Sequence, residues 1–174
     1  MLENLNSTRQ KTTINPVMAN RIMEIFQNFC NSDDGKILNS QVRYERYKPT
    51  TVSNERWIKI LGADVNNLNH MRLTYGLTRI FLEKQKGKFS NDEVNILLLT
   101  SIIHDIAEAK IGDISYDQKT DSDENEESKI ATNLFQTILF ESTLNIDPNE
   151  IQKYYLIKHI LYLVYLMQLK ELDT

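Results

Sequence analysis

Apolar residues recur at intervals of three and four positions along most of this chain, which is the spacing of one face of an α-helix. This spacing predicts helices over five ranges, namely 16–30, 67–85, 90–110, 130–140 and 148–170. Start signals support two of them, because Pro16 stands in the opening turn of the first and Ser90 with Glu93 forms a capping-box pattern. Alternation with a period of two, flanked by turn residues, is scarce. The pattern therefore predicts an all-α fold.

Polar segments separate these expected helices. Residues 31–35 contain Asn, Ser, Asp and Gly and are expected to end the first helix. Residues 36–56 are polar and ambiguous, and Pro49 indicates a loop that leads to Trp57. Residues 116–127 are rich in Asp and Glu and almost free of apolar residues, so we expect a solvated connection there.

Composition sets limits on the class of protein. The chain has 174 residues, of which 41% are hydrophobic, which is enough for one domain with a sizeable core. The net charge of −4 argues against nucleic acid or an anionic membrane as a partner. The single Cys30 cannot form an internal disulfide, no signal-peptide pattern is present, and the apolar stretches are interrupted too early to span a membrane. We expect a soluble, cytoplasmic protein.

The most informative chemistry lies at the end of the apolar run 95–113. His104, Asp105 and Glu108 are ionisable groups in a segment that otherwise predicts burial, and buried charge requires a partner or a metal ion. On a continuous helix His104 and Glu108 share a face, and Asp105 lies three residues before Glu108. Imidazole and carboxylate groups suit a divalent transition metal ion. An equally weighted alternative is that His104 and Asp105 only bond nearby backbone and cap the helix end.

Further ligands must come from elsewhere in the chain. His70 lies near the start of the preceding expected helix, where a short antiparallel connection would bring it beside His104. Asp173, at the end of the last expected helix, is a candidate fourth ligand.

The order His70, His104-Asp105, Asp173 resembles the H…HD…D ligand set of the HD-domain metal-dependent phosphohydrolases, from about Asn67 to the end of the chain. Residues 104–113 resemble the H-D-x-x-E-x-x-x-G-D signature of the branch that contains 5'-deoxynucleotidases. The pair Arg56-Trp57 resembles an arginine–tryptophan pair that this branch uses around its substrate.

The resemblance implies a single HD domain over residues 1–174, built as a helical bundle around one divalent metal ion. The ion would be Mn, Co, Mg, Fe or Zn, held by four ligands, His70, His104, Asp105 and Asp173. Glu108 would position or deprotonate the attacking water, and Asp113 would lie near the sugar or the leaving oxygen. Arg56 would bind the phosphate of a nucleoside 5'-monophosphate, and Trp57 would pack against the nucleoside.

The chain departs from the pattern of the branch at several places. Asn69 stands where an acidic residue usually precedes the first metal histidine, and Ile114-Ser115 replaces a small residue followed by proline. Arg56-Trp57 lies one residue closer to His70 than in the branch. The chain stops directly after Asp173, so either it is truncated, or a partner chain supports this end, or Asp173 is not a ligand.

Two other functions stay open at this point. One is a catalytically weak or inactive HD-fold module that binds a nucleotide or a metal, and the other is a phosphodiesterase or nucleotide pyrophosphohydrolase. If the apolar and aromatic surface of 154–165 exceeds what one domain buries, we expect a homodimer.

Overall fold

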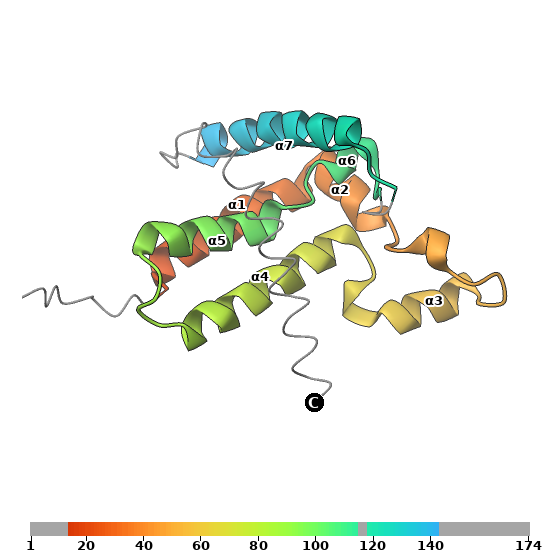
Figure 1. Cartoon of the computed structure of the whole chain (residues 1–174), viewed down its shortest axis with the longest axis horizontal. Coiled ribbons are helices and arrows are strands. Elements are labelled where there is room, and N and C mark those ends of the chain that lie inside the picture. Colours follow the sequence, from red (N-terminus) through yellow and green to blue (C-terminus); the bar gives the residue numbers. More distant parts are fainter. Residues whose placement is uncertain (1–13, 115–117, 143–174) are drawn as a thin grey trace, which may run out of the picture.

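Figure 1 shows the computed structural model, which describes residues 14–114 and 118–142. The elements are α1 (Pro16–Asn31), α2 (Asp33–Ser40), η1 (Glu45–Tyr47), α3 (Asn54–Leu61), η2 (Gly62–Asp64), α4 (Asn67–Lys84), α5 (Asn91–Ile103), α6 (Glu108–Ile111) and α7 (Asp121–Ser142). The described part contains no strand, and one isolated antiparallel bridge joins Val42 to Asn66. The prediction of an all-α fold is confirmed. None of the described helices combines the length and the apolar content that crossing a bilayer requires.

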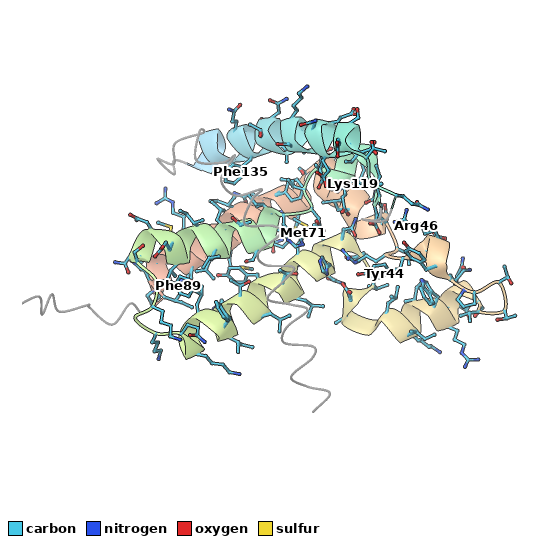
Figure 2. All side chains as sticks on the ribbon, in the orientation of Figure 1. Tyr44, Arg46, Met71, Phe89, Lys119 and Phe135 are labelled. Atoms are coloured by element: carbon cyan, nitrogen blue, oxygen red, sulfur yellow. The ribbon has the colours of Figure 1, made fainter. Side chains whose placement is uncertain are left out.

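The core forms where four helices meet. Helices α4 and α5 pack against each other as an antiparallel pair, α1 packs against α2 and α5, and α7 lies across α1 (Figure 1). Phe26 of α1, Met71 of α4 and Phe135 of α7 are almost completely buried. Figure 2 labels Met71 and Phe135 on their helices. Burial of each such side chain contributes about 1.5–3 kcal/mol to the stability of the folded state. The antiparallel arrangement places the first turn of α4 beside the last turn of α5, where the candidate chemistry lies.

The expected start signals are present at both helices. The Asn15 side chain accepts hydrogen bonds from the first turn of α1, with Pro16 as its first residue. At α5 the Ser90 hydroxyl accepts a hydrogen bond from the Glu93 backbone, and the Glu93 carboxylate accepts one from the Ser90 backbone at 2.7 Å. These hydrogen bonds lower the pKa of Glu93. The capping box is therefore confirmed.

The expected helix over 90–110 is not continuous. Helix α5 ends at Ile103, and a turn over residues 104–107 separates it from α6. Tighter hydrogen bonds close this turn, from the Ile106 amide to the Ile103 carbonyl and from the Glu108 amide to the Asp105 carbonyl. The prediction was wrong because apolar spacing does not register a change from four-residue to three-residue hydrogen bonding. His104 and Asp105 thus lie on a turn rather than on a helix face.

The stop signal after α1 is real, but a second helix follows it at once. The Ser32 hydroxyl donates to the Phe29 carbonyl at 2.6 Å and accepts from the Gly35 amide at 3.1 Å, so one residue ends α1 and begins α2. A Cβ on Gly35 would lie 2.2 Å from the Phe29 carbonyl oxygen, so this close approach requires glycine. The buried Leu38 then anchors α2 in the core. The short helices α2 and α3 were not predicted from the polar segment.

The acidic segment is not only a solvated connection, as was expected. Residues 121–127 form the first turns of α7, which continues without a break through the predicted helix over 130–140. The Asp123 carboxylate accepts a hydrogen bond from the Thr120 backbone at 2.8 Å, and Glu127 is buried in an ion pair with Lys119. Acidic residues stabilise the start of a helix because its first amide groups carry a partial positive charge. The predicted helix over 148–170 and Asp173 lie outside the described residues.

Ser90→Ala is expected to lower the free energy of unfolding by about 1 kcal/mol, because the first turn of α5 loses its cap. Chemical denaturation measures this change. The control is Ser122→Ala, an exposed serine in the first turns of α7, for which we expect a change within about 0.5 kcal/mol. Equal effects of the two substitutions would contradict the role of the capping box.

Candidate metal centre

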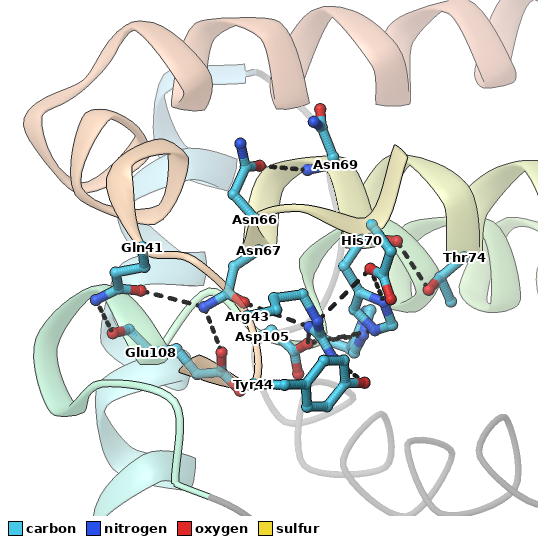
Figure 3. A network of polar contacts seen from close by, with 12 residues as sticks. Gln41, Arg43, Tyr44, Asn66, Asn67, Asn69, His70, Thr74, Asp105 and Glu108 are labelled. Atoms are coloured by element: carbon cyan, nitrogen blue, oxygen red, sulfur yellow. Dashed lines mark hydrogen bonds and ion pairs between the residues drawn. The ribbon is translucent and has the colours of Figure 1, made fainter. Parts of the chain in front are cut away.

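The candidate metal centre lies where the start of α4 meets the turn between α5 and α6 (Figure 3). The Asn66 side chain accepts a hydrogen bond from the Asn69 amide at 2.9 Å and begins α4, which places His70 in its first turn. His104 follows the last residue of α5, and Asp105 comes directly after it. The short connection between α4 and α5 therefore brings residues 70 and 104 together, as the sequence predicts.

Two imidazoles converge on one carboxylate oxygen. The distance to Asp105 Oδ2 is 3.0 Å from His104 Nε2 and 3.6 Å from His70 Nε2. The ring centroids of the two histidines are 5.1 Å apart, and candidate ligand atoms of the three residues all lie within 4.8 Å of one another. Asp105 is buried, and both histidines are partly buried. The three residues have the separation of a metal-ligand set.

The other nitrogen of each imidazole is already engaged. His104 Nδ1 lies 2.9 Å from the Ser101 carbonyl oxygen, and His70 Nδ1 lies 3.1 Å from Asp64 Oδ1. A carbonyl oxygen can only accept a hydrogen bond, and so can an ionised carboxylate, so both Nδ1 atoms donate. In a neutral imidazole this leaves the lone pair on Nε2, which faces Asp105. Such support is typical of metal-binding histidines.

This donor set fits a divalent metal ion. Two lone pairs and a carboxylate oxygen directed at one another repel unless a proton or a cation lies between them. Imidazole nitrogen with carboxylate oxygen is a common ligand combination for first-row divalent ions. In the alternative interpretation His104 only forms a hydrogen bond with the backbone. Nδ1 alone makes that hydrogen bond, so Nε2 remains available for a metal ion.

Arg43 is the charged neighbour that the sequence did not reveal. Its buried guanidinium lies 3.5 Å from Asp105 Oδ2 and 3.5 Å from Asp64 Oδ1. It also donates to Asn67 at 3.3 Å and to the Tyr44 hydroxyl at 2.8 Å. Burial alone would lower the pKa of Arg43, but Asp105, the hydrogen bond to Tyr44 and Asp64 together raise it. Arg43 thus stays charged and compensates part of the negative charge of the centre.

A buried amide connects the candidate metal centre to Glu108. Asn67 is completely buried, and its Nδ2 donates to Glu108 Oε2 at 2.6 Å and to Gln41 Oε1 at 3.1 Å. Gln41 in turn donates to the Glu108 carbonyl at 3.3 Å (Figure 3). Because the Asn67 oxygen accepts from Arg43, Glu108 belongs to the same polar network as Asp105.

The other predicted site residues lie at different distances from this network. Trp57 on α3 donates from its indole nitrogen to the Arg43 carbonyl at 3.4 Å, whereas the neighbouring Arg56 is exposed. None of the contacts of the described residues brings the Arg56 guanidinium to the histidines. Asp113 is half-buried and follows Gly112, whose φ of 79° ends α6. Asp173 lies outside the described residues.

The sequence reasoning missed several residues of the network, among them Arg43, Asp64 and Asn67. Arg43 and Asp64 come from segments without apolar periodicity, where no element was assigned. One signal for Asp64 did exist in the sequence. The resemblance implies a carboxylate partner for His70, and because Asn69 cannot provide it, another acidic residue near His70 is expected. Asp64, six residues before His70, supplies that carboxylate from η2.

Comparison with known proteins agrees with this geometry. A family model described as HD domain matches residues 53–155, which is more than half of the chain and includes His70, His104 and Asp105. No curated protein and no solved structure matches the chain. The chain belongs to the HD-domain family, whose members are in general metal-dependent phosphohydrolases.

Proposed function

We propose that the protein is a metal-dependent phosphomonoesterase that removes phosphate from nucleoside 5'-monophosphates, as 5'-deoxynucleotidases do. The observation that carries the proposal is the pair of Nε2 atoms of His70 and His104 that face Asp105 Oδ2, each ring being held by its other nitrogen. The likeness of residues 104–113 to the 5'-deoxynucleotidase signature supports the substrate class.

In this proposal His70, His104 and Asp105 hold the ion, and Asp173 is the fourth ligand. A divalent ion bound there would polarise the phosphate and lower the pKa of a nearby water molecule. Asp64, Asp105 and Glu108 carry three negative charges when ionised, and the proposed ligand Asp173 adds a fourth. Arg43 carries one positive charge, so an ion of charge +2 would offset most of the remaining negative charge. This balance does not discriminate between Mn, Co, Mg, Fe and Zn.

Glu108 is the proposed proton acceptor for the attacking water. The Asn67 amide donates to one of its oxygens at 2.6 Å, which fixes the carboxylate next to the turn that carries His104 and Asp105. A carboxylate held there can accept a proton from the attacking water. Glu108 is buried, so this proton transfer takes place away from bulk water.

The substrate side of the proposal involves α3 and the residue after α6. Trp57 is tied to the backbone of Arg43, so its ring lies on an element that contacts the centre, and we assign it to the nucleoside. Arg56 has the planar guanidinium that binds phosphate by two hydrogen bonds, and its exposure leaves it accessible to a ligand. Asp113 is assigned to the sugar or the leaving oxygen.

One observation favours the alternative of a catalytically weak or inactive module that binds metal or nucleotide. The Arg43 guanidinium lies 3.5 Å from the same Asp105 oxygen that faces both histidines, so this carboxylate has a counter-ion without a metal. Measurements of metal binding and of turnover separate the two functions.

Addition of Mn²⁺ or Co²⁺ to metal-free protein is expected to raise the melting temperature. At a free concentration of 100 times Kd, binding stabilises the folded state by about 2.7 kcal/mol. His104→Gln should lose most of this shift, whereas the control His159→Gln, the third histidine of the chain, should keep it. Differential scanning calorimetry with metal analysis measures both. An unchanged shift in His104→Gln would remove His104 from the ligand set.

Arg43→Gln is expected to destabilise the metal-free protein by roughly 3–5 kcal/mol, because the buried Asp105 carboxylate loses its counter-ion. Metal should then raise the melting temperature more in this variant than in the wild type, since the ion replaces the missing charge. Arg43→Lys should be intermediate, and the exposed Arg46→Gln serves as the control. Equal metal-induced shifts in Arg43→Gln and the wild type would show that Arg43 acts on packing alone.

The metal-loaded full chain is expected to release phosphate from nucleoside 5'-monophosphates, and Glu108→Gln should lower kcat by about 10²–10⁴-fold. Glutamine keeps an oxygen that accepts from Asn67, so the melting temperature and the metal affinity should stay near the wild-type values. A phosphate-release assay over ribo- and deoxyribonucleotides measures the activity. If metal binds with His104 as a ligand but no nucleoside 5'-monophosphate is hydrolysed, the phosphomonoesterase is wrong.

A further inference from the structure

Helix α4 is apolar on two opposite sides. Met71, Tyr75 and Leu82 are buried on the side that faces the core. Leu73, Leu77 and Ile80 follow the spacing of the same helix, but they are 41%, 40% and 51% exposed. A surface helix normally presents polar residues on its outer side, and a helix with apolar residues all round is normally buried. We call the outer residues Leu73, Gly76, Leu77 and Ile80 the α4 stripe.

Gly76 in the middle of the α4 stripe has no explanation in the described contacts. A Cβ added to Gly76 meets no atom within 4 Å, and glycine inside a helix is unfavourable relative to alanine. Gly35 shows the contrast, since there the Phe29 backbone fills the place of a Cβ. A small residue between large apolar neighbours allows another segment to approach the helix backbone closely. Both the exposed side chains and the glycine therefore indicate that a segment covers the α4 stripe.

The chain itself contains a segment that needs such a surface. Thirty-two residues follow Ser142, the last residue of α7, and residues 154–167 among them are almost continuously apolar and aromatic. As a helix, residues 150–170 would be about 31 Å long, against about 27 Å for the 18 residues of α4. In Figure 1 the end of α7 and the end of α4 both lie toward the left of the view. A segment that starts there and follows α4 runs antiparallel to it.

We propose that residues 150–170 of the same chain pack along the α4 stripe. The described surface favours this occupant over a second copy of the chain. A stable interface between separate molecules buries about 800 Å² on each partner, which is much more than three side chains and a glycine provide. A segment of the same chain needs less contact area, because its effective concentration is already in the millimolar range. The inference rests on α4 and on the sequence after Ser142, and not on the proposed reaction.

Photo-crosslinking in the full chain tests the proposal. Leu77→Cys in a Cys30→Ser background is labelled with a benzophenone maleimide and irradiated, and the products are analysed by denaturing gel and peptide mass spectrometry. We expect crosslinks within one chain to peptides from residues 150–170. The control is Ile37→Cys on α2, whose native side chain is also 40% exposed, and it should give no crosslinks to that segment. A crosslinked dimer, or crosslinks from Leu77→Cys that avoid residues 150–170, would overturn the proposal.

A second measurement avoids the bulky label. Leu77→Lys places a charge on the α4 stripe and should increase the rate of limited proteolysis within residues 150–170 by about tenfold or more, the factor that corresponds to the lost burial of one leucine. Ile37→Lys should leave that rate unchanged. Equal cleavage rates in Leu77→Lys and the wild type would show that the segment lies elsewhere, whether or not the protein hydrolyses nucleotides.

Discussion

The carboxylate of Asp105 is the group on which the rest of the structure depends. Its side chain is only 7% exposed, and removal of an ionised carboxylate from water costs several kcal/mol unless opposite charge and hydrogen bonds replace the lost hydration. Here Arg43 supplies the opposite charge on one side, whereas the two imidazoles face the carboxylate on the other side, where they would share a bound cation with it. Each of these partners comes from a different part of the chain. The folding of the segments around Asp105 is thus coupled to the neutralisation of one charge.

The helices provide this compensation through simple geometry. The antiparallel pair α4 and α5 brings the start of one helix to the end of the other, and the turn after α5 directs two consecutive side chains to the same place. In this turn His104 Nε2 and Asp105 Oδ2 lie 3.0 Å apart. The end of α5 thus supplies one imidazole and the carboxylate, and the start of α4 supplies the second imidazole.

The sequence predicts this arrangement only in part, for physical reasons that differ between segments. The predicted end of helix α4 differs from the observed end by one residue. A long run of apolar residues at helical spacing is enough to predict such a helix without knowledge of its tertiary contacts. Helix α2 has eight residues, and its position depends on the contact of Gly35 with the backbone of α1, which the periodicity does not contain. The acidic start of α7 was interpreted as solvated because the burial of Glu127 depends on its ion pair with Lys119.

The same distinction applies to the candidate site. His70 and His104 could be paired from the sequence because the short link between two helices fixes which ends meet. Arg43 and Asp105 are 62 positions apart, and Arg43 comes from a segment with no periodic pattern. Its role depends on tertiary contacts alone, so a reading based on local spacing had no means of finding it.

The contacts of Arg43 explain how the candidate metal ligands are held in place. Asp64 Oδ1 contacts both His70 Nδ1 and Arg43 Nε, and Asp105 Oδ2 contacts both His70 Nε2 and Arg43 Nη1. The four side chains thus form a closed ring of contacts, in which no member can shift without loss of two of them. A site whose ligands are already ordered loses less conformational entropy when it binds an ion, so more of the binding energy appears as affinity. Asn69 stands at a position where related proteins of the 5'-deoxynucleotidase branch usually have an acidic residue. His70 still has a carboxylate partner, because Asp64 contacts its Nδ1 and also contacts the Arg43 guanidinium.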